Sequence, residues 1–469
     1  MAKVFMLLSF QILFLTSILT IITGSFSSGF TLDLIHIDSP NSPYYNGNLT
    51  HVEKLQRLGL QSKARAYYLS HAEQNASFPQ TIRGQVQVQP MSIHMVQVSV
   101  GTFHDRNPHH IQYFLMFDTG SDLTWLQCED CASSGHHCFP QAEPLFPSSR
   151  SFTYRPVPCN DHRYCTSHRC NGKFCTYFIE YQDQAQTTGT LAHDTFTFGS
   201  SAGHGREESI ELIFGCGFDQ KHFDFVTSRE NRMAGYLGLG VTRLYYSFID
   251  QTRHLTDGRF SYCLPQTNDN GDVPPSLLRF GSDIPRSRQH LHTTRLLTHH
   301  DAHGYFLKLK DMSLAGNRLH IPERFFERGN SGSLGCVIDS GSGCSFIAER
   351  PFNMLKTAMI DYFEHKPGFQ LVDELYGFNL CFERPDSAGF GQLPRITFHF
   401  EGGDIEVRPE NLYVLGEHGR FYKFFCLAMY KATNGLTIIG ARQQADQRVI
   451  YDTQHMQLHF GPEDCAHNA

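Results

Sequence analysis

Short apolar runs separated by Gly and Pro dominate the chain from about residue 91 onward. Runs of this length, bounded by turn residues, predict β-strands. The clearest examples are His94–Val100, Ile111–Phe117, Thr195–Phe198, Leu307–Leu309 and Ile396–Phe400. Helical apolar spacing is rare in this region, and Pro351–Glu364 is its best case. The pattern therefore predicts a mostly β protein.

Two segments of this region share one order of residues: apolar, Asp, hydroxyl residue, Gly, Ser. They are Phe117–Ser121 and Ile338–Ser342, and each follows an apolar run. Such a run delivers its Asp into a tight Gly turn and leaves a half-buried carboxylate at a strand end. Two such carboxylates brought face to face must share a proton, since like charges about 3 Å apart cannot both ionise. Asp118 and Asp339 are therefore a candidate pair for activating water.

A weak internal repeat supports two related halves. Tyr236-Leu237-Gly238 follows the first Asp, and Ile438-Ile439-Gly440 follows the second. An apolar pair before Gly means little once, but the same order in both halves predicts two lobes. Each lobe would thread its Asp loop past a crossing strand, with the active site in the cleft between lobes.

The first 28 residues have the pattern of a signal peptide. Lys3 gives a positive start, Val4 to about Thr23 is mainly apolar, and Gly24 opens a small-residue cleavage region. A membrane anchor is the alternative, since about 20 apolar residues can span a bilayer. No charged stop-transfer segment follows, and the C-terminal tail is polar. We therefore expect no stable membrane insertion after removal of the leader.

Residues 29–90 form a polar region without Cys, and both N-glycosylation sequons, at Asn48 and Asn75, lie there. Within it, His51–His71 has roughly helical apolar spacing. The same stretch is basic, with Lys54, Arg57, Lys63 and Arg65. A basic helix ahead of an acidic site predicts a removable pro-segment whose cations face the catalytic carboxylates. The alternative is an ordinary amphipathic helix packed on the domain.

Composition narrows the class of protein. The net charge is −7 with both signs mixed, which argues against nucleic acid binding. The 14 Cys all lie between Cys128 and Cys465, as expected for disulfides in an exported mature domain. Cys128, Cys131 and Cys138, with the neighbouring His pair, also resemble a zinc site. The even Cys count favours disulfides over zinc, and because two carboxylates can activate water unaided, we expect neither a metal nor a cofactor.

Further segments carry a resemblance that covers nearly the whole chain. They are Gly29–Pro40, Phe117–Trp125, the Cys-rich stretch Cys128–Cys175, Ile213–Gly217, Phe260–Cys263, Val337–Ser342 and Asn379–Phe382. On these segments the chain resembles the pepsin-like aspartic proteases, specifically the plant nepenthesin-type secreted branch.

The resemblance implies a bilobal, mostly β fold and endopeptidase activity at acidic pH on extended polypeptides. It implies a signal peptide at 1–28, a pro-segment at 29–90, an N-terminal lobe at 91–275 with a Cys-rich insertion and a flap, and a C-terminal lobe at 276–469. Asp118 and Asp339 would be the catalytic dyad, supported by Thr119, Gly120, Ser121, Ser340, Gly341 and Ser342. Thr119 and Ser340 would exchange hydrogen bonds between lobes. Ser121 and Ser342 would bond the outer carboxylate oxygens. We expect a monomer, because one chain supplies both Asp residues.

The resemblance also implies that a flap binds substrate, and the chain departs from the family pattern at two places. Tyr181 falls at the flap tyrosine, and Trp125 would steady it through the indole N–H, although plain core packing is the alternative. Gln182 and Gln184 stand where the family usually has Gly, which would stiffen or crowd the flap tip. Gly343 replaces the usual Ser or Thr that bonds substrate backbone, so one substrate contact would be lost.

The resemblance also implies a disulfide pattern. Its six bridges are Cys128–Cys131, Cys138–Cys216, Cys159–Cys175, Cys165–Cys170, Cys263–Cys465 and Cys381–Cys426. Cys336 and Cys344 remain and bracket Asp339. We predict a seventh bridge between them, Cys336–Cys344, with two buried free thiols as the alternative.

Two functions stay open at the level of sequence. The first is a secreted aspartic endopeptidase, in the extracellular space (the apoplast) or the vacuole. The second is a catalytically weak relative that acts as a protein- or glycan-binding module or as an inhibitor. Both Asp residues and both adjacent hydroxyls are present, which favours the enzyme, whereas the altered flap favours the binder.

Overall fold

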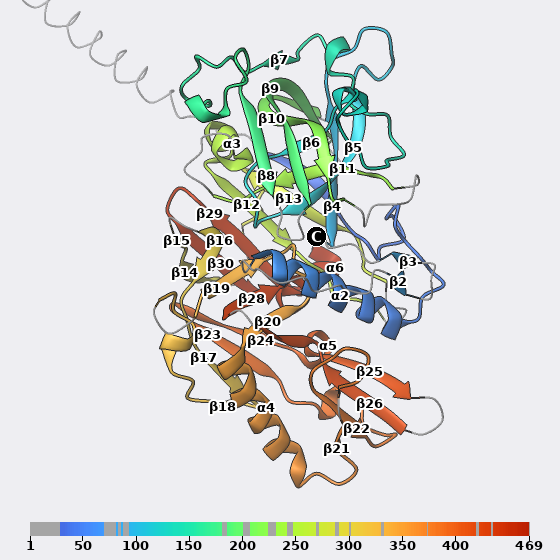
Figure 1. Ribbon diagram of the computed structural model, residues 1–469. Coiled ribbons are helices and arrows are strands. Elements are labelled where there is room, and N and C mark those ends of the chain that lie inside the picture. The colour runs from blue at the N-terminus through green and yellow to red at the C-terminus, as the bar shows by residue number, and fades with distance from the viewer. Residues whose placement is uncertain are drawn as a thin grey trace, which may run out of the picture.

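The structure is a computed structural model (Figure 1). It describes residues 29–468 except 70–80, 83–85, 88–92, 181–184, 200–206, 224–230, 242–246, 269–271, 287–289, 300–301, 330–332, 373, 419–421 and 433–434. The predicted signal peptide, the sequon at Asn75 and the predicted flap tip with Tyr181, Gln182 and Gln184 therefore lie outside the described residues. The other sequon, at Asn48, is exposed in a turn.

The upper half of Figure 1 is built on one long sheet, as the apolar runs predict. Its order is β14 (His292–Arg295), β30 (Gln457–Pro462), β29 (Gln447–Asp452), β12 (Arg259–Cys263), β13 (Ser276–Gly281), β1 (Gly29–His36), β4 (His94–Val100), β5 (Ile111–Asp118), β11 (Met233–Gly238), β6 (Trp125–Gln127), β10 (Glu207–Lys221), β9 (Gln186–Gly199) and β7 (Arg155–Pro156), and β8 (Thr176–Glu180) pairs with β9. The C-terminal strands β29 and β30 belong to this sheet, so it joins both halves of the molecule.

The lower half holds three smaller sheets. The first runs β15 (Leu297–His299), β16 (Ala302–Leu307), β19 (Gly335–Asp339), β28 (Leu436–Gly440), β20 (Ser345–Ala348) and β27 (Met429–Ala432). The second runs β18 (Asn317–Arg318), β17 (Leu309–Leu314), β23 (Ile396–Phe400) and β24 (Gly403–Val407). The third runs β21 (Gln370–Val372), β22 (Cys381–Arg384), β26 (Tyr422–Leu427) and β25 (Tyr413–His418). A separate hairpin joins β2 (Thr81–Ile82) and β3 (Val86–Gln87).

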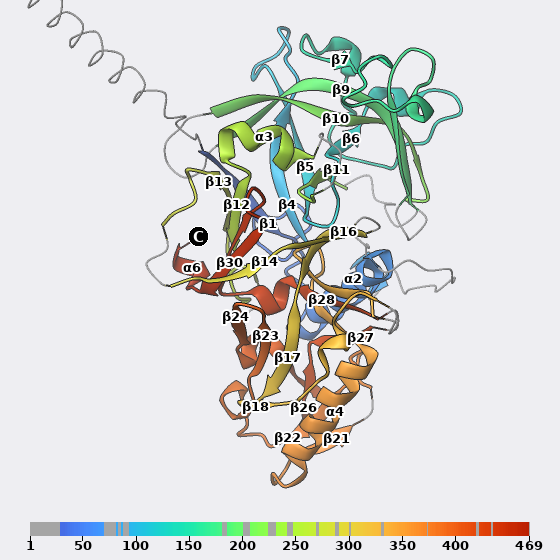
Figure 2. The ribbon, with the colours of Figure 1, turned by 90° about the vertical axis from the view of Figure 1, so that its left-hand side faces the viewer.

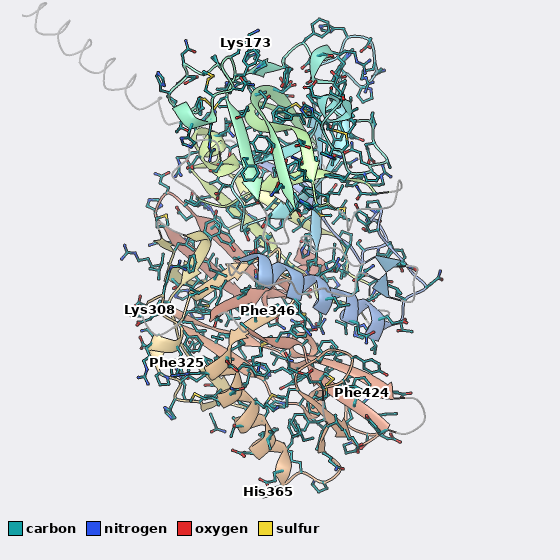
Figure 3. The ribbon with its side chains drawn as sticks, in the orientation of Figure 1. Lys173, Lys308, Phe325, Phe346, His365 and Phe424 are labelled. Atoms are coloured by element: carbon teal, nitrogen blue, oxygen red, sulfur yellow. A yellow bond between two sulfur atoms is a disulfide. The ribbon has the colours of Figure 1, made fainter. Side chains whose placement is uncertain are left out.

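Helices are few among the described residues: α2 (His51–Leu69), α3 (Phe248–Thr256), α4 (Glu349–Glu364), α5 (Pro409–Leu412) and α6 (Cys465–Asn468). Helix α4 buries one apolar face, including Phe352, Leu355 and Met359, as its spacing predicts. Lys173 and His365 mark opposite ends of the elongated molecule in Figure 3. The mostly β, bilobal fold is thus confirmed, and no helix of the described part is long and apolar enough to cross a membrane.

Two four-strand units repeat the same pairing. In the first repeat, β5 pairs in parallel with β11, β11 antiparallel with β6, and β6 in parallel with β10. In the second repeat, β19, β28, β20 and β27 pair with the same directions in the same order. Gly238 lies opposite Asp118, and Gly440 lies opposite Asp339. The crossing strands predicted from the two apolar-apolar-Gly segments are therefore present.

Glycine is required at both crossing points because another backbone passes directly beside it. A Cβ on Gly238 would collide with the backbone of Asp122, and a Cβ on Gly440 would collide with the backbone of Cys344. The two halves thus use the same residue type for the same steric reason.

One predicted strand, Leu307–Leu309, is wrong. Strand β16 ends at Leu307, opposite Cys336, and β17 begins at Leu309, opposite Phe400. The chain leaves one sheet and enters another at Lys308, so the apolar pattern continues although the strand does not.

The polar N-terminal region is part of the fold. Strand β1 lies between β13 and β4, and Phe30 stacks on Phe280 at a centroid distance of 4.5 Å. Helix α2 crosses the junction of the two halves in both ribbon views (Figure 1, Figure 2). Residues 29–69 therefore contact both halves instead of forming a separate appendage.

The disulfides differ from the predicted pattern. The structure pairs Cys128–Cys216, Cys131–Cys138, Cys159–Cys170, Cys165–Cys175, Cys263–Cys465 and Cys381–Cys426. Only the last two are among those predicted. The predicted bridges Cys128–Cys131, Cys138–Cys216, Cys159–Cys175 and Cys165–Cys170 are wrong.

Strand register explains these exchanges. Strands β6 and β10 pair with Leu126 opposite Cys216, which places Cys128 beside Cys216 at a Cα–Cα distance of 5.4 Å. In the Cys-rich insertion, the Cys175 N–H bonds the carbonyl of Val157 at 2.8 Å. Cys175 therefore lies two positions from the site opposite Cys159, and it pairs with Cys165 instead.

The predicted Cys336–Cys344 bridge is also wrong: both residues are buried free thiols. Cys336 belongs to β19, and Cys344 directly precedes β20. Strand β28 lies between β19 and β20. Two strand spacings amount to roughly 9.6 Å, beyond the roughly 7 Å between Cα atoms that a disulfide can span.

Candidate active site

Two buried aspartates occupy equivalent positions in the two repeats. Asp118 is the last residue of β5 and Asp339 the last residue of β19. Their exposed fractions are 0 % and 2 %. Each begins a turn that we call the first Asp loop (Asp118–Ser121) and the second Asp loop (Asp339–Ser342).

Each turn holds its own carboxylate. The Gly120 N–H donates to Asp118 Oδ1 at 2.8 Å, and the Gly341 N–H donates to Asp339 Oδ1 at 3.1 Å. This contact with the backbone two residues later is the local turn that Asp side chains favour. It fixes one oxygen of each carboxylate in the same way in both loops.

The two Asp loops are in direct contact. Thr119 Oγ1 lies 3.4 Å from Asp339 Oδ1 and 3.3 Å from Ser340 Oγ. The Ser340 N–H donates to the same Thr119 oxygen at 3.2 Å. Thr119 directly follows Asp118, so these contacts place the loop that carries Asp118 directly beside Asp339. Thr119 and Ser340 thus hydrogen-bond between the two halves, as the resemblance implies.

The loops differ at their serines. Ser342 Oγ donates to Asp339 Oδ2 at 2.7 Å, as the resemblance implies. Ser121 Oγ is buried and has no hydrogen-bond partner among the described residues, so its predicted bond to the outer oxygen of Asp118 is wrong in this structure. The second carboxylate therefore receives one more side-chain hydrogen bond from its own loop than the first.

Trp125 is completely buried and stacks on Tyr236 with ring centroids 5.7 Å apart. Its core-packing contacts are thus present. Its predicted bond to Tyr181 involves a residue outside the described part and stays a prediction.

Helix α2 contacts the two residues that directly follow the second Asp loop, Gly343 and Cys344. The Cys344 N–H donates to Ser62 Oγ at 2.7 Å, and Ser62 in turn donates to the carbonyl of Leu58 at 2.7 Å. A Cβ on Gly343 would collide with the Leu58 side chain. Gly343 thus lies against this helix, and its missing side chain makes room for Leu58.

The cations of α2 bind elsewhere than predicted. Lys54 pairs with Asp272 at 2.7 Å, Arg57 pairs with Asp38, and Lys63 donates to the carbonyl of Gly377 at 2.7 Å. The expectation that these three cations face the catalytic carboxylates is therefore wrong. Ser62 and Leu58 of this helix instead contact Cys344 and Gly343, directly after the second Asp loop.

A cavity of about 40 Å³ is lined by residues of this N-terminal region and of later parts of the chain, and the buried His36 and His94 are among them. Burial lowers the pKa of His36 to about 3, and the positive charge of Arg57 contributes to this shift. Its ring lies edge-on to that of His94 at 5.0 Å, and burial holds the pKa of His94 well below its usual range. The His94 ring also hydrogen-bonds the backbone of Ser340. Composition gave no signal for this chain of contacts from β1 to the second Asp loop.

Comparison with known proteins agrees with this geometry. The family model described as "Xylanase inhibitor N-terminal" matches residues 95–282, and "Xylanase inhibitor C-terminal" matches residues 304–462. Aspartic proteinase nepenthesin-1 of Nepenthes gracilis is 28 % identical over 93 % of this chain and 91 % of its own length. An aspartyl protease family protein of Arabidopsis thaliana is 31 % identical over 75 % of this chain and 69 % of its own length. The chain belongs to the plant pepsin-like aspartic protease family.

A solved structure of this aspartic protease fold, that of edgp, matches with a TM-score of 0.62. It is 16 % identical and covers 93 % of this chain and 95 % of that chain, which shows the shared fold.

The cysteines of the zinc alternative, Cys128, Cys131 and Cys138, are joined in disulfides, and the described residues contain no group of side chains that could hold a metal ion.

Proposed function

We propose that this protein is a secreted aspartic endopeptidase that acts in acid and is made with an inhibitory pro-segment. The contact of Thr119 with Asp339 and Ser340 carries the proposal, because it joins the two Asp loops at the carboxylates. Family membership supports the same conclusion through relatives named as aspartic proteinases.

The chemistry follows from two carboxyl groups that share a site. One must be protonated while the other is ionised, and the titration belongs to the pair. The ionised group takes a proton from a water molecule, which attacks the peptide carbonyl, and the protonated group stabilises the developing oxyanion. Hydrogen bonds to Asp339 from Ser342 and Gly341 stabilise the charged form.

The substrate is proposed to be a polypeptide in extended conformation, held by backbone hydrogen bonds between the site and the flap. Gly343 offers no side-chain hydroxyl for this purpose, so the remaining contacts would come from backbone and flap. We propose that the chain acts as a monomer, since both carboxylates come from one chain.

The pro-segment assignment rests on helix α2 and strand β1. Ser62 and Leu58 contact the residues that directly follow the second Asp loop, where substrate must enter. A leader, sequons and six disulfides fit export to the extracellular space or the vacuole.

The deciding experiment is a protease assay on denatured protein between pH 2 and 8, with the Asp339→Asn variant beside the parent chain. The matched control is Asp311→Asn, because Asp311 is a buried carboxylate in the same half whose side chain accepts from Ile321 N–H at 3.0 Å. We expect acid cleavage by the parent and the control, and none by Asp339→Asn. Equal faint cleavage by parent and Asp339→Asn would refute the enzyme.

A second candidate is a catalytically weak relative that binds proteins or inhibits other enzymes. The names of the matching family models and the missing hydroxyl at Gly343 favour it. If the parent chain folds correctly but cleaves no substrate in the assay above, the binding or inhibitory function is the one that remains.

A further inference from the structure

Three tyrosines lie fully buried beneath the two Asp loops. Tyr262 comes from β12, Tyr305 from β16 and Tyr451 from β29, with exposed fractions of 1 %, 1 % and 0 %. The Tyr262 and Tyr451 hydroxyls lie 3.0 Å apart, and the rings of Tyr305 and Tyr451 lie 4.5 Å apart. We call this cluster the tyrosine brace.

Tyr262 links the first Asp loop to the second repeat. Its ring packs edge-on against Phe117, the residue before Asp118, with centroids 5.8 Å apart. Its hydroxyl donates to Gln444 Oε1 at 2.7 Å. Gln444 then donates through Nε2 to the carbonyl of Ile439 at 2.7 Å. Ile439 lies in β28, directly before the glycine opposite Asp339.

Tyr305 makes the opposite connection. It lies in the second half, opposite Ile338, the residue before Asp339. Its hydroxyl donates across the junction to the carbonyl of Leu239. The Leu239 N–H donates to the Asp118 carbonyl at 2.8 Å. A second-half tyrosine is thus one residue removed from the backbone of the first carboxylate.

Both hydroxyls remain donors throughout the pH range in which carboxyl groups titrate. Burial raises the pKa of Tyr262, and the neighbouring Asp339 charge raises it further. Burial likewise raises the pKa of Tyr305. Burial raises the pKa of Tyr451 as well, and the Asp339 charge adds to this effect. Two tyrosines of the brace, Tyr262 and Tyr451, therefore lie close enough to Asp339 to interact with its charge.

We propose that Tyr262 and Tyr305 are positioning residues that set the separation of Asp118 and Asp339 by bracing the two repeats in opposite directions. The proposal rests on the proposed function for its kinetic consequence. Coupling between two carboxyl groups weakens with their separation. A looser brace therefore brings the two apparent pKa values of the pair closer together, and it places the attacking water less accurately.

The test compares Tyr262→Phe and Tyr305→Phe with Tyr413→Phe in the full chain. Tyr413 is also fully buried, and its hydroxyl donates to the carbonyl of Pro394 at 2.9 Å, far along the chain from either Asp loop. All three variants lose one buried hydroxyl. We expect kcat to fall about tenfold for the two brace variants, with KM little changed and a narrower pH profile. Tyr413→Phe should keep the parental profile. Tyr451→Phe leaves both cross-junction bonds and should have a smaller effect.

A second measurement does not depend on activity. Carboxyl titration of the ¹³C-aspartate-labelled full chain, assigned by loss of signal in Asp118→Asn and Asp339→Asn, reports the two apparent pKa values of the dyad directly. We expect their difference to shrink in Tyr262→Phe and Tyr305→Phe alone. Unchanged titration in both, with equal loss of unfolding stability in all three phenylalanine variants, would reduce the brace to core packing. If the parent chain proves inactive, the proposed function fails while the titration still decides this inference.

Discussion

The first and second Asp loops share their strand pairing, their crossing glycine and the bond from Gly N–H to carboxylate, yet they differ in what surrounds them. The second loop receives the Ser342 hydroxyl on its carboxylate, and helix α2 contacts the residues that directly follow this loop. In the first loop, the Ser121 hydroxyl has no hydrogen-bond partner among the described residues. This loop supplies Thr119, whose hydroxyl oxygen contacts Asp339 of the second loop. The repeated strand pairing thus gives both carboxylates the same backbone setting, whereas the additional contacts are concentrated around the second.

The largest expected effect tests whether the two carboxylates are chemically equivalent. Asp118→Asn and Asp339→Asn should each lower kcat by about 10²–10⁴-fold, because each removes one member of an acid–base pair. The double variant should be no worse than either single variant, since the pair acts as a unit. Steady-state kinetics on one peptide substrate measure this. Substantial activity in only one single variant would break the equivalence.

The second prediction concerns the cover over the second loop. Released His36 takes up a proton near pH 6.5, whereas docked His36 does so only near pH 3, because burial and the charges of Arg57, Lys54 and Arg442 oppose its protonated form. The ring of His94 packs edge-on against it. Its contribution to docking is therefore complete above pH 6.5 and is lost as the pH falls toward 3. The loss amounts to up to about 1.4 kcal/mol per pH unit.

Hydrogen exchange of the β1 amides against pH, in an Asp339→Asn background that prevents self-cleavage, measures this docking. We expect protection to decrease in acid, and His36→Asn to move the decrease to lower pH. His254→Asn, at an exposed histidine on α3, is the control. The same midpoint for His36→Asn and the parent would show that this histidine does not sense acid.

The third prediction separates the two hydroxyls that join the loops. Thr119→Ala leaves the buried Ser340 N–H unpaired, so it should cost about 1–3 kcal/mol of unfolding free energy. Ser340→Ala removes one hydroxyl contact and should cost about 0.5–1.5 kcal/mol. Thr119→Ser should restore the parental value. Urea denaturation at neutral pH measures all three, and equal losses for the two alanine variants would contradict the asymmetric arrangement.

The smallest effect comes from the two serines. Ser342→Ala removes a donor that favours ionised Asp339, so the lower apparent pKa of the pair should rise by up to about one unit. Ser121→Ala should leave the profile close to the parental one, since its hydroxyl bonds no described group. The acid limb of kcat/KM measures the shift. A larger shift for Ser121→Ala would reverse the comparison.

Local patterns were sufficient to predict the fold and both Asp loops. Asp118 and Asp339 carry their signal in five consecutive residues, and Gly238 and Gly440 carry theirs in three. Each pattern reflects sterics within one turn or one crossing, so no knowledge of distant contacts is required.

Pairing between distant segments could not be predicted in this way. Cys128 joins Cys216 because of the register between β6 and β10, which no spacing reveals. The same holds for Tyr262 and Tyr305, whose hydroxyls find partners only after the two halves have docked. Whether the Ser121 hydroxyl reaches a partner depends on shifts of about an ångström, and a sequence motif does not specify positions that finely.

Cys336 and Cys344, the two thiols outside the disulfides, make the outcome of unfolding depend on pH. Burial raises the pKa of both, that of Cys344 to about 11, so neither reacts while the chain is folded. Once exposed at neutral pH, a thiolate can attack any of the six bridges and scramble them. In acid the thiolate is scarce and the original pairs survive. Thermal unfolding should therefore be irreversible near neutral pH and reversible under the acidic conditions in which the proposed enzyme works.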